Sequence, residues 1–201
     1  YCLALDGQKR QVAVVSSNAG HALYGGIASR EHGELVAERL LTEDIFSGWG
    51  VRTLSTREVR YNPVGYHVGT VWPHDNALTA FGLKRYGAEE QLVRLSTGLF
   101  DASKHFPSGR MPELFAGFAR SAFDVPVRYP VACSPQAWAA ASWSMILQAL
   151  LGVSPDGLRA LAGVANAALT VVERDARGRH RLHSWNDAAH LEGLVVDEHS
   201  D

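Results

Sequence analysis

The chain is 201 residues long, 46% of its residues are hydrophobic, and its formal net charge is −2 at pH 7. This length and composition are typical of one globular domain or of part of a larger one. The balanced charge offers no basic face to nucleic acid, and no apolar run reaches the roughly 18 residues that a transmembrane helix needs. We therefore expect no nucleic-acid partner and no membrane span.

The two cysteines, Cys2 and Cys133, form neither a metal-ligand spacing nor a disulfide framework. With no signal-peptide pattern, this favours a reduced, cytoplasmic protein that uses no metal or other cofactor. We expect Cys133 to be a buried structural cysteine. The chain starts at Tyr1, inside an expected strand, which indicates a fragment or a trimmed chain.

The first third of the chain predicts a small hairpin and two helices of different character. Residues 1–15 contain a turn signal at Asp6 and Gly7 between short apolar runs, which favours a hairpin. Residues 19–28 are small and apolar, so we expect a buried helix there. Residues 31–41 have one apolar stripe among charged side chains, the pattern of a surface helix.

The pattern then repeats after a loop of about thirty residues, which is long enough to suggest a function. Pro73 suits a first helical position, and residues 73–86 predict a second buried helix. Residues 89–105 predict a surface helix, and a second long loop covers residues 106–133. Next, Ser134 is expected to cap a third buried helix that begins at Pro135 and ends near residue 151.

Short links follow the buried helices and long loops follow the surface helices, so the buried helices should run parallel, with their N-termini at one rim. The sequence thus predicts an all-α fold in residues 1–153, a partial two-layer ring of helices with minor β-hairpins at the ends. For residues 154–201 we expect a separate C-terminal tail, with a short helix over 154–168 and a hairpin over 169–183.

Residues 66–76 combine aromatic rings, imidazoles, a carboxylate and an amide at the start of a helix. A sugar site needs this mixture, because rings stack on sugars while amides and carboxylates bind hydroxyl groups. Together with two other segments, this stretch supplies the candidate substrate-binding residues, which are Trp49, Arg52, Tyr66, His67, Trp72, Asn76 and Gln136.

Four ordered motifs resemble the C-terminal part of bacterial glycogen-debranching-type amylo-α-1,6-glucosidases, of the six-hairpin glycosidase superfamily. The resemblance covers about residues 1–153. The motifs are FSGWGVRTL at 46–54, YHVGTVWPHDN at 66–76, MPELFAGF at 111–118 and YPVACSPQAW at 129–138.

The resemblance implies the C-terminal half of an (α/α)6 toroid that hydrolyses α-1,6-glucosidic links, in glycogen-like glucans or oligosaccharides, by inversion. It also implies that Glu113, in the Met-Pro-Glu-Leu motif, is the catalytic base. The family's acid lies in an upstream Trp-x-Asp motif, which is not found ahead of Ser16. The Trp-x-Asp triplet that ends at Asp187 lies at the wrong end of the chain. We therefore expect the isolated chain to be inactive.

Several candidate site residues could instead have a purely structural role. Asp75 is a weak candidate for a catalytic carboxylate, since it can instead bind a substrate hydroxyl or oppose the helix dipole. Trp49 and Trp72 can stack on a sugar or pack in the core. Arg52 can bind hydroxyl groups or pair with a carboxylate of its loop. Gln136 can face the cleft or support the loop before it.

Two other functions remain open from the sequence. The chain can be a non-catalytic helical module that binds a carbohydrate or a partner, or another six-hairpin glycosidase, trehalase-like or mannosylglycerate-hydrolase-like. The expected partners are a glucan or oligosaccharide substrate and either the missing N-terminal half of the same protein or a second copy of the chain. Half a ring should leave apolar helix faces uncovered.

Overall fold

The computed structural model describes residues 1–153, 169–177 and 179–187, and the chain divides into two compact units, Tyr1–Leu150 and Leu151–Asp201. The first unit begins with a two-stranded antiparallel hairpin of β1 (Ala4–Leu5) and β2 (Gln11–Val12), in which Ala4 pairs with Val12. The predicted N-terminal hairpin is therefore present.

Two antiparallel helices follow the hairpin, α1 (Asn18–Gly25) and α2 (Arg30–Leu40). Gly26 ends α1 at φ 69°, a left-handed conformation that glycine adopts without a steric cost. Ser29 begins α2, and its hydroxyl accepts a hydrogen bond from the backbone N–H of His32 at 3.2 Å.

Three longer helices complete the first unit: α3 (Pro73–Arg85), α4 (Glu89–Ser103) and α5 (Ala137–Leu151). Pro73 occupies the first turn of α3, as the sequence predicted. A single turn of 3-10 helix, η1 (Pro107–Gly109), lies in the second long loop.

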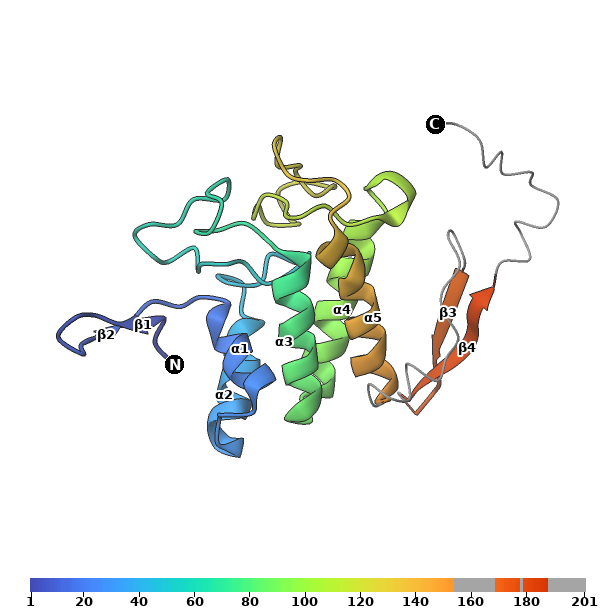
Figure 1. Ribbon diagram of the computed structural model, residues 1–201, viewed down its shortest axis with the longest axis horizontal. Helices are drawn as coiled ribbons and strands as arrows, with labels where there is room; N and C mark the ends of the chain where they lie inside the picture. Colours follow the sequence, from blue (N-terminus) through green and yellow to red (C-terminus); the bar gives the residue numbers. More distant parts are fainter. Residues whose placement is uncertain (154–168, 178, 188–201) are drawn as a thin grey trace. The chain divides into compact units, whose positions relative to one another are not determined.

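Figure 1 shows that α1, α3 and α5 all run down from the end at which the long loops lie, while α2 and α4 run back toward it. The contacts between the helices agree, because α3 packs against both α1 and α4, and α1 packs against α2. This is the predicted arrangement: a mostly helical, partial α/α toroid with small antiparallel hairpins.

The two long loops are joined to each other by backbone pairing. Val71 and Phe115 exchange hydrogen bonds in both directions, at 2.9 and 3.0 Å, and Val71 also pairs with Arg52. Phe115 pairs in turn with Arg128. The loops therefore form a connected rim above the helix N-termini, and their backbone groups are satisfied without a regular sheet.

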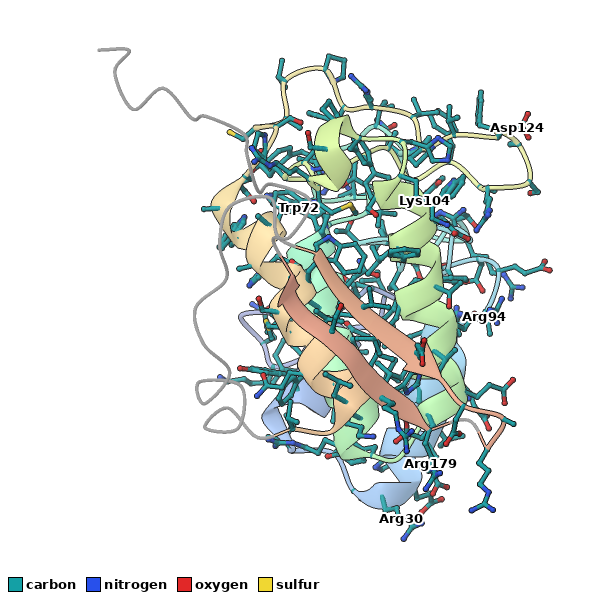
Figure 2. All side chains as sticks on the ribbon, turned by 90° about the vertical axis from the view of Figure 1, so that its right-hand side faces the viewer. Arg30, Trp72, Arg94, Lys104, Asp124 and Arg179 are labelled. Carbon is teal, nitrogen blue, oxygen red and sulfur yellow. The ribbon has the colours of Figure 1, made fainter. Side chains whose placement is uncertain are left out.

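The core lies between the helix layers and extends under this rim. Leucine side chains of α2, α3 and α4 are fully buried there together with Val71 and Phe115. In Figure 2, Arg30 and Arg94 lie at the edge of the molecule. Lys104 is also exposed, whereas Trp72 is buried. The burial of one face of α2 and of α4 matches the apolar stripes in their sequences.

Two helices are less buried than their composition predicts. In α1, only Gly20, Ala22 and Leu23 are buried. In α5, which the sequence predicted to be a buried helix, Trp138 is 49% exposed. An apolar helix is expected to bury its side chains against other parts of the protein. Among the described residues, nothing packs against the exposed faces of α1 and α5.

The start of α5 also differs from the prediction, because the helix begins at Ala137 rather than at Pro135. The first intrahelical bond runs from the N–H of Ala140 to the carbonyl of Gln136 at 2.9 Å. Gln136 is therefore the residue that flanks the helix, and Pro135 belongs to the preceding loop, after a cis peptide bond.

The second unit contains one antiparallel hairpin, β3 (Leu169–Arg174) and β4 (His180–Asp187), as the sequence predicted for this stretch. The expected short helix over 154–168 and the tail after residue 187 lie outside the described residues. Within the described ranges, none of the helices has both the length and the apolar character needed to cross a membrane.

Candidate functional site

Glu113 lies on the rim, in the segment between η1 and α5, and contacts come to it from two other parts of the chain. Its carboxylate oxygen Oε1 accepts a hydrogen bond from the Tyr66 hydroxyl, and Oε2 accepts one from the backbone N–H of Cys133 at 3.3 Å. The backbone N–H of Glu113 donates to the Cys133 carbonyl at 2.9 Å. The carboxylate is therefore fixed by both long loops.

Aromatic rings surround the hydroxyl donor. The Tyr66 ring meets Trp72 edge-on with centroids 4.9 Å apart, and Tyr129 lies at 5.9 Å. His67 stacks on Trp72 at 5.2 Å with an interplanar angle of 15°. We call Tyr66, His67, Trp72, Glu113, Tyr129 and Cys133 the rim cluster.

The negative charge of Glu113 controls the ionisation of its neighbour. The hydrogen bond to Glu113, together with the charge of that carboxylate, raises the pKa of Tyr66 to about 12. Tyr66 therefore remains a neutral hydroxyl across the physiological range and keeps its proton to donate.

Trp72 supports the cluster from below and has little open surface of its own. It is 8% exposed, and its indole N–H donates to the Tyr66 carbonyl and to the Thr70 hydroxyl, both at 3.0 Å. Tyr66 is 39% exposed and His67 is also exposed. The most exposed rings of the rim cluster are therefore Tyr66 and His67, Tyr129 is half-buried, and Trp72 lies beneath them.

Asp75 faces a different partner. Its Oδ1 atom lies 2.5 Å from Nε2 of His21 on α1, and its Oδ2 atom is buried without a hydrogen-bond partner among the described residues. This contact with Asp75 raises the pKa of His21. Next to it, His74 stacks on Trp138 at 4.6 Å, and burial lowers the pKa of His74.

Asn76 and Arg52 are buried within the rim. Asn76 is 1% exposed, accepts from the N–H of Val51 at 2.7 Å, and donates to the carbonyls of Val51 and Trp72. Arg52 is 2% exposed and donates to the carbonyls of Gly117 and Glu43 at 2.6 and 3.0 Å. Burial lowers the pKa of Arg52. Both side chains hold loop segments together.

Trp49 and Gln136 complete the predicted set, and the structure places them apart from the rim cluster's contacts. Trp49 is 2% exposed, with the guanidinium of Arg120 over its ring at 4.3 Å. The Oε1 atom of Gln136 is buried without a hydrogen-bond partner in the described part of the chain. Of the predicted residues, the structure thus brings together Tyr66, His67, Trp72 and Glu113.

The sequence did not point to three residues that contact the candidate site residues: Tyr129 and Cys133, in the rim cluster, and His21, beside Asp75. Cys133 is exposed, not buried as predicted, because it lies on the rim segment that faces Glu113. Tyr129 and Cys133 stand in the fourth motif, so the motif was the available signal. His21 lies in a run of small residues, where no signal marks it. The described histidine, cysteine, aspartate and glutamate side chains form no group of three able to hold a metal ion.

A partial α/α toroid with a carboxylate and aromatic rings on its loop rim is consistent with the class of six-hairpin glycosidases. Residues 2–115 match the family model of the mannosylglycerate hydrolase MGH1-like glycoside hydrolase domain. The chain belongs to this family.

Solved structures with the same fold come from Thermus thermophilus. An uncharacterized conserved protein shares 17% identity at a TM-score of 0.56, over 69% of this chain and 32% of that one. A GH63 mannosylglycerate hydrolase in complex with glucose shares 16% identity at a TM-score of 0.56, over 70% of this chain and 33% of that one. The same hydrolase with Tris and D-glycerate has a TM-score of 0.57.

This chain therefore spans about a third of the length of those proteins. A comparison with curated proteins gave no significant match.

Proposed function

We propose that this chain is the part of a glycoside hydrolase domain that carries the catalytic base, and that Glu113 is that base. The observation that carries the proposal is the pair of hydrogen bonds that fix the Glu113 carboxylate on a ring-lined rim, from the Tyr66 hydroxyl and the Cys133 N–H. The family match supports the reaction class.

The geometry suits a base that acts on water. In inverting hydrolysis, one carboxylate removes a proton from a water molecule while an acid protonates the leaving oxygen, roughly 6.5–9.5 Å away. Each oxygen of Glu113 accepts one hydrogen bond, and a carboxylate has about four lone-pair sites in total, so a site remains for the water. Tyr66 and His67, backed by Trp72, form the wall against which the sugar lies.

The general acid of the reaction is not among the residues that contact the rim cluster. Asp75 is a poor choice because one oxygen is held by His21 and the other is buried. We infer that the remainder of the toroid provides the acid, either from the same protein or from a second copy. Supporting this, α1 and α5 leave large side chains uncovered, with Tyr24 41% and Trp138 49% exposed.

Two substrate classes follow from different observations. The family match favours a small α-linked glycoside of the mannosylglycerate type. The motifs around Trp72 and Glu113 favour an α-1,6-linked glucan or oligosaccharide, because they resemble the debranching glucosidases. A linear α-1,4-glucan serves as the comparison substrate for both.

The test is an assay of the protein with its complete toroid on mannosylglycerate and on α-1,6- and α-1,4-linked glucosides. Glu113→Gln should lower kcat by about 10²- to 10⁴-fold, the range for loss of a general base. Glu31→Gln, an equal change on the exposed face of α2, should leave kcat unchanged. Proton NMR of the first product should show inverted anomeric configuration.

Full activity in Glu113→Gln would remove this residue from the mechanism. A wild type that binds oligosaccharide but hydrolyses none of the three substrates would favour the non-catalytic module.

A further inference from the structure

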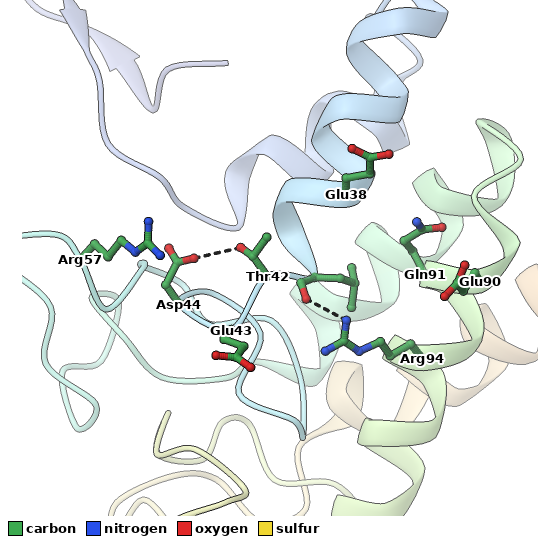
Figure 3. Close-up of a pocket in the computed structure, with 9 residues that line it drawn as sticks. Glu38, Thr42, Glu43, Asp44, Arg57, Glu90, Gln91 and Arg94 are labelled. Atoms are coloured by element: carbon green, nitrogen blue, oxygen red, sulfur yellow. Dashed lines mark hydrogen bonds between the residues drawn. The ribbon is translucent and has the colours of Figure 1, made fainter.

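A polar groove runs along the outer side of the first unit, beside α2 and α4. It consists of two adjoining hollows of about 570 and 590 Å³, which share Glu43, Asp44, Arg57 and Arg94. Figure 3 shows the first of them, with Glu38 above on α2, Glu90 and Gln91 on α4, and Arg94 reaching across below them. None of the lining residues belongs to the rim cluster.

The charges are divided between the two ends. The end beside Glu38 and Glu90 is acidic, whereas four arginines line the other end, namely Arg52, Arg57, Arg94 and Arg120. The carboxylates that line this end of the groove are Glu43 and Asp44. Asp44 is already used within the fold, because it accepts hydrogen bonds from Arg39, Thr42 and Ser55.

Packing holds two of the arginines in place. The guanidinium of Arg94 lies over the Phe46 ring at 4.9 Å and donates to the Leu41 carbonyl at 3.0 Å. The guanidinium of Arg120 lies over Trp49 and pairs with Asp101 at 2.8 Å. Stacking on a ring fixes the plane of a guanidinium while leaving N–H groups at its edge, so less entropy is lost when an anion binds.

The other two arginines have charges without a carboxylate hydrogen-bond partner. Arg52 is 2% exposed, and its guanidinium donates to two backbone carbonyls. The Arg57 side chain makes no hydrogen bond or ion pair with any residue that the structure describes. Buried charges in proteins are normally paired, so this end of the groove has positive charge in excess.

We propose that the arginine end of the groove binds a small anionic ligand through its phosphate or carboxylate group. Arg57 and Arg94 contact the oxyanion directly, because they are shared by both hollows and have N–H groups free of carboxylates. Arg52 adds charge from beneath. Guanidinium groups suit such anions because they form paired, charge-assisted hydrogen bonds.

The test titrates the chain with inorganic phosphate and, separately, with acetate, each followed by calorimetry and by NMR of the arginine side chains. Binding of phosphate alone identifies a phosphate ligand, and binding of acetate alone identifies a carboxylate ligand. The double substitution Arg57→Gln and Arg94→Gln should weaken binding at least tenfold. Arg30→Gln removes one positive charge from the exposed part of α2 and is the matched control for Arg57→Gln alone; it should leave the dissociation constant unchanged.

Three results would overturn the proposal: no binding of either anion by the wild type, an unchanged dissociation constant in the double variant, or an equal weakening in Arg30→Gln. If the double variant fails to fold, Arg57→Gln alone decides the question, because its exposed side chain has no partner to lose among the described residues. Hydrolysis assays do not bear on this groove, since it shares no residue with the rim cluster.

Discussion

The polar residues of the rim fall into an exposed group, which contacts Glu113, and a buried group, which holds the backbone of the loops. In the stretch 66–76, Tyr66 is 39% exposed and directs its hydroxyl to Glu113, whereas Asn76 is 1% exposed and holds the backbone of Val51. Arg52 and Asp44 resemble Asn76 in being buried and used within the fold. We call Asp44, Arg52 and Asn76 the anchor residues. A dense polar motif therefore contains both scaffold and surface groups, and burial separates them.

The sharpest test of this comparison is Asn76→Ala, which should reduce stability by about 3 kcal/mol. The change removes three hydrogen bonds and leaves the buried N–H of Val51 without an acceptor, which is costly in a low-dielectric interior. Unfolding in denaturant measures this loss in the free energy of unfolding. Asn62→Ala, on the exposed loop, should cost less than about 1 kcal/mol. Equal effects at the two sites would contradict the assignment of Asn76 to the scaffold.

Asp44→Asn should cost about 2 kcal/mol at neutral pH and change the acid response. Hydrogen bonds from Arg39, Ser55 and Thr42 hold the pKa of Asp44 well below its usual range against the effect of burial. A depressed folded-state pKa gives stability that is present above the unfolded pKa and is lost as pH falls through the folded value.

The wild type should therefore lose this part of its stability below about pH 4, and Asp44→Asn should lack that loss. Unfolding curves between about pH 2 and pH 7 measure the difference. Parallel pH profiles for wild type and variant would contradict the role of Asp44.

Tyr66→Phe tests the other side of the comparison and should lower kcat about tenfold while leaving stability nearly unchanged. The variant keeps the ring but removes the hydroxyl that donates to Glu113, so the carboxylate keeps only the bond from Cys133. Tenfold corresponds to about 1.4 kcal/mol. A loss of stability like that of Asn76→Ala, with kcat unchanged, would make Tyr66 a scaffold residue.

The smallest expected effect concerns His21, which belongs to neither group. Its contact with Asp75 raises its pKa, while burial lowers the pKa of the adjacent His74, so NMR titration should move the two imidazoles in opposite directions from about 6.5. The stabilisation from His21 is complete below that unfolded pKa and is lost as pH rises through the folded value. Because the His21 side chain is 45% exposed, His21→Gln should cost under about 0.5 kcal/mol at pH 6.

An unmoved His21 signal in Asp75→Asn would show that another group causes the shift. The same titration reports on His74, which should keep its lowered pKa in that variant, since burial against Trp138 is its first cause.

The helices were predictable because local signals agree with the fold. Pro73 gives the start of α3 directly, and the apolar stripes of α2 and α4 give their buried faces. The partial ring of helices followed from the alternation of buried and surface helices together with the lengths of the links between them. Trp138 could not be placed, because its exposure depends on what covers α5 and not on its own neighbours in sequence.

The candidate site was predictable in part. The motifs selected Tyr66, His67, Trp72 and Glu113, which the structure brings together. They also selected Arg52 and Asn76, which are buried, because a motif shows that a residue type is needed without showing why. Tyr129 and Cys133 needed the fold, since their contacts with the rest of the cluster join segments far apart in sequence.

The reciprocal pairing of Val71 and Phe115 has a consequence for the order in which the protein assembles. The two residues are separated by the whole of α3 and α4. Forming this contact therefore closes a long loop and costs more conformational entropy than forming a helix, whose contacts are local. Contacts of long sequence separation slow folding. The rim should therefore form after the helix pairs, so the helices can be native before the rim cluster exists.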